Sequence, residues 1–162
     1  HAGGLLHRDL KPPNIMLRAD GAVVLIDFGL AKRVDSDSTN TAIGVLRGSP
    51  FYMSPEQITG RTLDARSDLY SLGVLFYEML TGNRPYTGLT AMDVMQQHVK
   101  GERPELPAHL AAFDPVLRRL MAVDPAHRYA NASAVMEDLE RLAAELTQTH
   151  TTNISPVIAI AS

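Results

Sequence analysis

The sequence predicts a mainly α-helical fold that carries one small β-hairpin near its beginning. From residue 66 onward, apolar residues recur at helical spacing in several stretches that end near glycine or proline. Before that point, two short apolar runs separated by Asp20-Gly21 have the pattern of a strand pair. With 162 residues the chain can bury a real core, so we expect one domain or one lobe of a larger domain.

Composition and charge restrict the class of protein. A net charge of −3 provides no basic surface for nucleic acid, so we expect no nucleic-acid partner. The absence of cysteine excludes disulfides and thiolate metal sites and fits a reducing compartment, so the cytoplasm is the expected location. No apolar run approaches the roughly 20 residues of a membrane helix, and we expect no membrane segment in this chain. The chain begins at His1 without the pattern of a signal peptide, and we expect it to be cut from a longer protein.

The stretch from His7 to Asn14 is the densest in chemistry. It contains the carboxylate of Asp9, the cations of Arg8 and Lys11, and the carboxamide of Asn14. Its two consecutive prolines prevent the segment from continuing as a helix. Because binding and catalytic groups tend to lie on loops held by a rigid scaffold, we interpret the stretch as a rigid polar loop that belongs to a functional site.

The two apolar runs that follow this loop predict the hairpin. They cover residues 14–18 and 22–26, and the Asp-Gly pair between them is a strong turn signal. A hairpin with this register would bring Asp27 back beside Asn14.

Residues 66–80 predict the central helix of the core. They are apolar on nearly every face, and Gly82 closes the helix. We assign Leu75 and Met79 on this helix, and Met16 on the hairpin, to the core. Three further helices follow along the chain.

The first of these three helices is predicted by Thr90 followed by Asp93, an N-terminal capping signal, and it extends to about Lys100. The next carries the apolar positions between Val116 and Met121.

The last helix has an apolar stripe of Val135, Leu139, Leu142 and Leu146, and we expect it to end near Thr147. We therefore divide the chain into a folded part, residues 1–147, and a disordered tail or linker, residues 148–162.

Three motifs occur in order along the chain. His7-Arg8-Asp9-Leu10 followed by Asn14 matches the H-R-D-L-x-x-x-N catalytic loop, Asp27-Phe28-Gly29 matches D-F-G, and Ser54-Pro55-Glu56 stands where A-P-E is expected. On these residues the chain, from His1 to about Leu146, resembles the large C-terminal lobe of a protein kinase. That resemblance implies a helical lobe with a small β-hairpin that carries the catalytic and metal-binding loops. Ser54 replaces the alanine of the A-P-E motif, but the charged residue of the motif, Glu56, is present.

The branch of the family is indicated by two further features. Lys11, two positions after Asp9, resembles the serine/threonine branch. The segment from Gly48 to Gln57 is similar to the substrate-facing loop of that branch, in particular of bacterial, eukaryotic-like kinases, so the resemblance implies a protein substrate. Within it, Ser49 resembles the hydroxyl residue that touches Asp9 and Lys11, and we expect a structural or catalytic contact there.

The resemblance assigns roles in phosphoryl transfer, where catalysis consists largely of positioning and charge stabilisation. It implies that Asp9 accepts the proton of the substrate hydroxyl and that Lys11 offsets charge on the transferring phosphate. Asn14 and Asp27 would hold the Mg²⁺ ions that bridge the phosphates of ATP. The resemblance also places Met16 near the adenine, so Lys11, Asn14, Met16 and Asp27 are the expected ATP-binding residues. Taken singly, each aspartate could be a turn or cap residue, and the joint motif argues against that.

Other residues are expected to support the site. By resemblance, His7 packs near Phe28, Asp68 braces the catalytic loop from below, and Arg128 pairs with Glu56.

Residues 34–41 have almost no apolar side chains, and we expect a mobile loop. A phosphate on this loop would be bound by Arg8 and would order the loop. We choose Thr41 as the phosphorylated residue, and a solvated loop without a regulatory role is the alternative.

The sequence contains no glycine-rich nucleotide loop and no strand lysine of the kinase type, since its lysines are Lys11, Lys32 and Lys100. We therefore expect the N-terminal kinase lobe, a required partner, to be missing, and the chain alone to transfer no phosphate. A lobe cut in this way should expose apolar surface.

Three functions remain in competition. A protein serine/threonine kinase is favoured because Asp9, Lys11, Asn14 and Asp27 are all present. A non-catalytic pseudokinase scaffold would follow if the parent protein lacked the strand lysine. A small-molecule phosphotransferase shares the aspartate-to-asparagine loop, but it would not need the peptide-docking segment 49–56.

Overall fold

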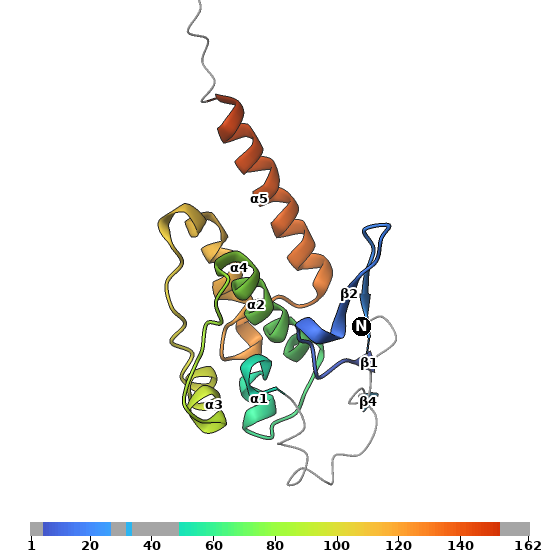
Figure 1. Cartoon of the computed structure of the whole chain (residues 1–162), viewed down its shortest axis with the longest axis vertical. Helices are drawn as coiled ribbons and strands as arrows, with labels where there is room; N and C mark the ends of the chain where they lie inside the picture. The colour runs from blue at the N-terminus through green and yellow to red at the C-terminus, as the bar shows by residue number, and fades with distance from the viewer. Residues whose placement is uncertain (1–4, 27–31, 34–48, 153–162) are drawn as a thin grey trace, which may run out of the picture.

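The computed structural model describes residues 5–26, 32–33 and 49–152. The predicted fold class is confirmed, because helices form the body and a small antiparallel hairpin lies at its side (Figure 1). The helices are α1 (Pro55–Ile58), α2 (Ala65–Thr81), α3 (Ala91–Lys100), α4 (Asp114–Leu120) and α5 (Ala132–Thr152). The strands are β1 (Leu5–Leu6), β2 (Ile15–Leu17), β3 (Val23–Leu25) and β4 (Lys32–Arg33). Short 3-10 helices are η1 (Pro12–Asn14), η3 (Pro50–Tyr52), η4 (Ala108–Phe113) and η5 (Pro125–His127).

The predicted hairpin is confirmed as strands β2 and β3. Its register pairs Ile15 with Leu25 and Leu17 with Val23. Gly21 in the turn has a φ of 82°, a left-handed conformation that glycine adopts at little cost. A second antiparallel pair joins β1 to β4, and runs of two residues are too short for the sequence pattern to indicate them.

Helix α2 lies at the centre of the core. The carboxylate of Asp64 caps its first turn by accepting the backbone N–H of Arg66 at 2.8 Å, and Gly82 closes it with a φ of 71°. Tyr70 and Val74 on this helix are fully buried. The prediction of a core helix that ends at Gly82 is therefore confirmed.

Two methionines that the sequence assigns to the core are exposed. Met79, near the end of α2, is 73% exposed and Met16 on β2 is 50% exposed, whereas Leu75 is buried as predicted. Met79 lines a pocket together with Pro12 and Ile15. The core assignment of the two methionines was wrong because apolar character alone does not tell whether another element covers a side chain.

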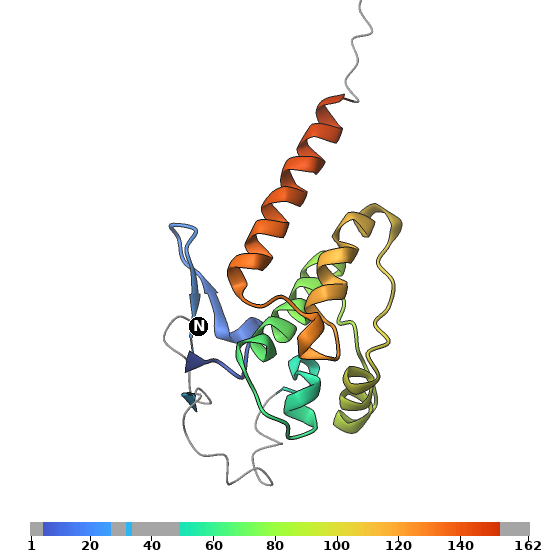
Figure 2. The ribbon, with the colours of Figure 1, turned by 180° about the vertical axis from the view of Figure 1, so that it is seen from behind.

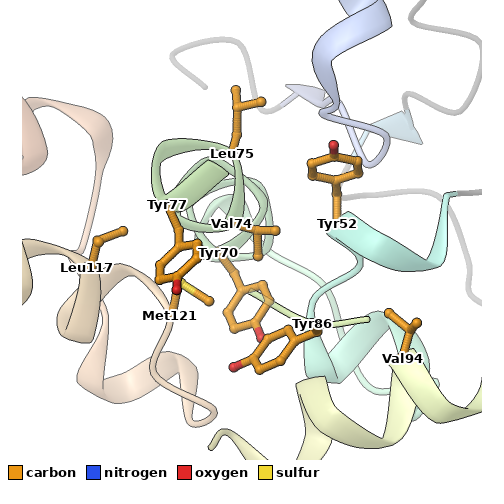
Figure 3. Close-up of a cluster of buried hydrophobic side chains, with 9 residues drawn as sticks. All are labelled: Tyr52, Tyr70, Val74, Leu75, Tyr77, Tyr86, Val94, Leu117 and Met121. Atoms are coloured by element: carbon orange, nitrogen blue, oxygen red, sulfur yellow. The ribbon is translucent and has the colours of Figure 1, made fainter. Parts of the chain in front are cut away.

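The main core cluster is rich in tyrosine (Figure 3). Its buried members come from η3, α2, α3, α4 and the adjoining turns: Tyr52, Tyr70, Val74, Leu75, Tyr77, Tyr86, Val94, Leu117 and Met121. Helices α2 and α4 approach closely at Gly73, where a Cβ atom would lie 2.7 Å from the Cβ of Leu120. Glycine at this position permits the close packing of the two helices.

Helices α3 and α4 follow the predictions. In the capping box of α3, Thr90 Oγ1 accepts the backbone N–H of Asp93 at 3.2 Å, and the Asp93 carboxylate accepts that of Thr90 at 2.9 Å. Helix α4 buries Val116, Leu117 and Leu120 as expected.

Helix α5 is longer than predicted. It places Val135 in a second core cluster with Leu69 and then rises away from the other helices (Figure 2). The helix ends at Thr152 instead of near Thr147, so residues 148–152 are helical and not part of a tail. Thr147 and Gln148 are exposed, and the residues at this end of the helix have no apolar stripe from which a longer helix could be predicted. None of the helices in the described ranges combines the length and apolar character needed to cross a bilayer.

Candidate active site

The polar loop from His7 to Asn14 is held from two sides. The Asp68 carboxylate on α2 accepts the backbone N–H of His7 at 2.8 Å and that of Arg8 at 2.9 Å. From the other side, Gln57 Nε2 donates to the carbonyl of Arg8 at 2.8 Å. Arg8 has a φ of 65° and, among the described residues, is the one non-glycine residue in the left-handed region. Such a conformation costs on the order of 1–2 kcal/mol and persists where surrounding contacts determine it, as these three hydrogen bonds do.

Three side chains of this loop meet. Lys11 Nζ lies 2.7 Å from Asp9 Oδ2, and Asn14 Nδ2 donates to the same oxygen at 3.2 Å and to the Asp9 carbonyl at 2.8 Å. The Asp9 side chain is 11% exposed and that of Lys11 23%, so both reach solvent from a largely enclosed position. The structure therefore brings these three predicted residues together.

Asn14 has one polar atom left for a ligand. Both hydrogen bonds of its carboxamide use the NH₂ group, so the oxygen remains, and amide oxygens are suitable ligands for Mg²⁺. The backbone N–H of Ile26 donates to the Asn14 carbonyl at 2.9 Å, so the hairpin returns the chain to Asn14 one residue before Asp27. Asp27 and Phe28 lie outside the described residues. Within the described ranges, no cluster of three or more histidine, aspartate or glutamate side chains could hold a metal ion.

The remaining predicted residues are placed as follows. His7 is buried, and its Nε2 lies 3.2 Å from the carbonyl of Ile26, at the end of the hairpin. Ser49 is the N-cap residue immediately before η3, and its backbone carbonyl accepts the N–H of Tyr52 at 3.2 Å. Within the described residues, no hydrogen bond joins the Ser49 side chain to Asp9 or Lys11, and a contact of Ser49 with them stays a prediction. Thr41 lies outside the described ranges.

Glu56 and Arg128 form a buried ion pair. The two guanidinium NH groups of Arg128 donate to the two Glu56 carboxylate oxygens at 2.7 and 2.8 Å, and both side chains are at most 5% exposed. Ser67 Oγ on α2 donates to Glu56 as well, at 2.7 Å. Burial alone would raise the pKa of the Glu56 carboxyl, but the hydrogen bonds from Arg128 and Ser67 outweigh burial and lower it. The pair ties the segment after Ser54 to helix α2 and to the η5 region.

Sequence reasoning missed two residues that position the site. Gln57 joins the capping box of Ser54 and also holds the Arg8 carbonyl. Ser71 Oγ donates to the Tyr52 carbonyl at 2.7 Å. The Ser-x-x-Gln spacing of residues 54–57 is a capping-box signal that could have identified Gln57. The Ser71 contact joins distant segments, and no local pattern indicates it.

The chain belongs to the protein kinase domain family, whose sequence model matches residues 1–139. The known proteins similar to it include serine/threonine-protein kinases of mycobacteria. PknL of Mycobacterium tuberculosis is 44% identical over 150 residues, which cover 90% of this chain and 37% of PknL. PknB of Mycobacterium tuberculosis is 42% identical over 148 residues, and PknB of Mycobacterium leprae is 40% identical over 147 residues. Each of these two matches covers 88% of this chain and 24% of the relative, so the chain spans well under half the length of the curated relatives it matches.

Proposed function

We propose that this chain is the C-terminal, helical lobe of a protein serine/threonine kinase. In the full-length protein it would contribute Asp9, Lys11, Asn14 and Asp27 to ATP-dependent phosphoryl transfer onto serine or threonine hydroxyls of a protein substrate. The observation that carries the proposal is the contact of Asp9 with both Lys11 and Asn14, on a loop whose backbone is fixed by Asp68. The similarity to PknL and PknB supports the same reaction class.

The geometry of the loop is compatible with the chemistry that the kinase resemblance assigns to it. Asp9 would orient the substrate hydroxyl and accept its proton, since its carboxylate is an acceptor that still reaches solvent. Lys11, held 2.7 Å from Asp9, would place a positive charge beside the transferring phosphate. Positioning by hydrogen bonds, and not covalent chemistry, is what this reaction requires of the protein.

ATP and Mg²⁺ are the cofactors that these residues fit. The free amide oxygen of Asn14, together with Asp27 one residue beyond Ile26, would provide hard oxygen ligands for magnesium. Bound Mg²⁺ would neutralise charge on the nucleotide phosphates. Met16, half exposed on β2, would contact the adenine ring.

Apolar surface supports the proposal that a further kinase lobe packs on this chain. The hairpin exposes Met16, Leu17, Val23 and Leu25 to between 40% and 71%, and Met79 on α2 is 73% exposed. Large exposed apolar surface of this kind marks an interaction site. We propose that the N-terminal lobe covers it, and that the chain alone transfers no phosphate because no strand lysine is available to complete the ATP site.

Regulation of this site would involve Arg8. Its Nε atom is buried and, within the part of the chain that the structure describes, has no hydrogen-bond partner, while Asp68 and Gln57 fix its backbone. A phosphate on Thr41 would provide charged acceptor atoms for this guanidinium and would order the loop next to Ser49. Mass spectrometry of the active full-length kinase should find phosphate on Thr41, and an unmodified loop in active protein would refute this role.

The kinase activity is tested by Asp9→Asn in the full-length protein. We expect at least about a hundredfold loss of magnesium-dependent transfer from radiolabelled ATP to a protein substrate, because the hydroxyl loses its proton acceptor. Asp20→Asn is the matched control, since this aspartate lies in the exposed hairpin turn, and it should leave the rate unchanged. Equal rates for Asp9→Asn and wild type would contradict the assignment. A wild-type protein without any transfer would favour the pseudokinase alternative.

A further inference from the structure

A second charged cluster lies at the end of helix α2. The Tyr52 hydroxyl donates to Glu78 Oε2 at 2.5 Å, and the other oxygen of Glu78 lies 3.5 Å from Nε of Arg84. Arg84 also stacks on the ring of Phe51, with its Cζ 4.1 Å from the ring centroid. We call Phe51, Tyr52, Glu78 and Arg84 the Glu78–Arg84 cluster.

This cluster joins η3 to the end of helix α2, beside the catalytic loop. Phe51 and Tyr52 belong to η3, which directly follows Ser49 in the segment proposed to face the protein substrate. Glu78 also lines the pocket that contains Pro12, the residue after Lys11. The Glu78 side chain is 25% exposed and that of Arg84 is 41% exposed, so a bound peptide could reach both.

The Glu78 carboxylate would attract a cation if Arg84 were absent. Tyr52 occupies one of its oxygens, and a lysine or arginine of a substrate could pair with the other. In the structure this position is taken by Arg84 from within the chain. The Arg84 contact to Glu78 is an ion pair without a hydrogen bond, and stacking on Phe51 adds a second attraction that keeps the guanidinium in place.

We propose that Arg84 determines substrate specificity by occupying Glu78 as a built-in cation, which excludes basic side chains of the protein substrate from the surface beside Phe51. This inference rests on the proposed kinase function. The favoured substrate carries an uncharged or acidic side chain at the position that meets this surface, since a second cation would be repelled by Arg84.

The test measures how binding depends on a single arginine in the peptide. The peptides are fluorescein-labelled, consist of glycine and alanine, and have a central serine. Each peptide carries a single arginine, whose position differs from one peptide to the next. Its matched partner has glutamine in place of that arginine. Fluorescence anisotropy gives the affinity of each pair for the 162-residue chain. For wild type we expect no arginine peptide to bind more tightly than its glutamine partner, and the arginine peptide that meets Arg84 to bind up to about twofold more weakly. For Arg84→Ala we expect the arginine peptide to bind roughly fivefold more tightly at one position, the size typical of a partly exposed ion pair.

Control variants separate specificity from support of the fold. Arg84→Lys keeps the charge and should keep the wild-type ratio. Arg118→Ala removes the same charge from the surface of α4, where the side chain is 76% exposed, and should not change the ratio. Adding Glu78→Gln to Arg84→Ala should abolish the gain. If Arg84 only supported the fold, Arg84→Ala would weaken the binding of the arginine peptide and of its glutamine partner equally.

The proposal is overturned if Arg84→Ala shows no gain at any position, if wild type already prefers arginine, or if the gain survives Glu78→Gln. The arginine-to-glutamine ratio in kcat/KM of the full-length kinase is a second measurement of the same property. If neither form binds or phosphorylates any of these peptides, this surface is not a peptide site and the proposal fails. Peptide selectivity without any phosphate transfer would instead refute the kinase function and leave the role of Arg84 standing.

Discussion

Two buried polar clusters hold the segment that follows Ser49, and they satisfy their polar atoms to different degrees. In the Glu56 cluster, Arg128 donates to both carboxylate oxygens and, in addition, to backbone carbonyls at 2.7 to 3.0 Å. The second cluster is aromatic and neutral. There Tyr70 Oη lies 2.9 Å from His98 Nδ1, while the Tyr86 hydroxyl and His98 Nε2 are buried and make no hydrogen bond of good geometry within the described ranges. The Tyr86 hydroxyl lies near Tyr70, and the His98 ring lies near the backbone of Pro50 and Phe51.

The two clusters differ in the energetic cost of burying their polar groups. A buried charge is costly unless it is paired and hydrogen-bonded, and the Glu56 cluster meets both conditions. A neutral group can be buried with a poorly satisfied polar atom at a smaller cost, as His98 and Tyr86 are. We therefore expect the two clusters to respond differently to substitution and to acid.

The largest effect should follow from Arg128→Met. The substitution leaves the Glu56 carboxylate buried without a cation, which typically costs about 3–5 kcal/mol in the free energy of unfolding. Urea unfolding of the chain measures the loss. Adding Glu56→Gln should recover part of it, because the buried charge is then removed. A loss as small as that of Arg118→Ala on the exposed surface of α4 would show that the pair is not structural.

Acid should destabilise the His98 cluster. Burial lowers the pKa of His98 from its ordinary value of 6.5 to about 4, against the opposing effect of the Pro50 and Phe51 backbone groups. Between these two values the unfolded chain binds a proton that the folded chain does not. The free energy of unfolding should therefore fall as pH falls from 6.5 to about 4, by up to about 3 kcal/mol for this group.

The control for this prediction is His98→Asn, whose carboxamide can bond to Tyr70 but does not titrate. Its unfolding free energy, measured against pH in the same window, should decline less steeply than that of wild type. The lowered pKa of Glu56 also causes a loss of stability in acid, but both proteins share that loss. Parallel curves for the two proteins would mean that His98 is not buried in the neutral form.

Ser67→Ala should have an intermediate effect. It removes one hydrogen bond to the Glu56 carboxylate and leaves the pairing with Arg128 in place, which should cost about 2 kcal/mol. Thermal unfolding compared with Ser133→Ala, a change at an exposed position of α5, measures it. A cost equal to that of the exposed serine would place Ser67 outside the cluster.

Tyr86→Phe should have the smallest effect. Among the described residues the lost hydroxyl makes no hydrogen bond of good geometry, so its removal should change the free energy of unfolding by less than about 1 kcal/mol. Tyr70→Phe is the matched comparison, because its hydroxyl is bonded to His98. If Tyr86→Phe proved the more destabilising of the two, the contrast between satisfied and unsatisfied groups would fail.

The sequence predicted the features that depend on neighbouring residues. The Thr90 and Asp93 capping box, the closure of α2 at Gly82 and the Asp-Gly turn of the hairpin are short-range patterns, and all are present. The cluster of Asp9 with Asn14 was also predictable, because both lie on one short loop.

Features that depend on distant contacts were not predicted in this way. Met16 and Met79 have the character of core residues, and only the tertiary arrangement shows that no described element covers them. The contacts of Glu78 with Tyr52 and Arg84 join separate segments through side chains whose types are also common on exposed surfaces. The burial of His98 likewise follows from the packing of α3 on η3 and α1, which no local pattern specifies.

We propose that this chain holds one half of a kinase active site, built around Asp9, Lys11 and Asn14. The most direct test assays the 162-residue chain beside the full-length protein that contains it, with radiolabelled ATP, Mg²⁺ and a protein substrate. We predict transfer by the full-length protein and none by the chain alone. Transfer by the isolated chain, or none by the full-length protein, would contradict the account.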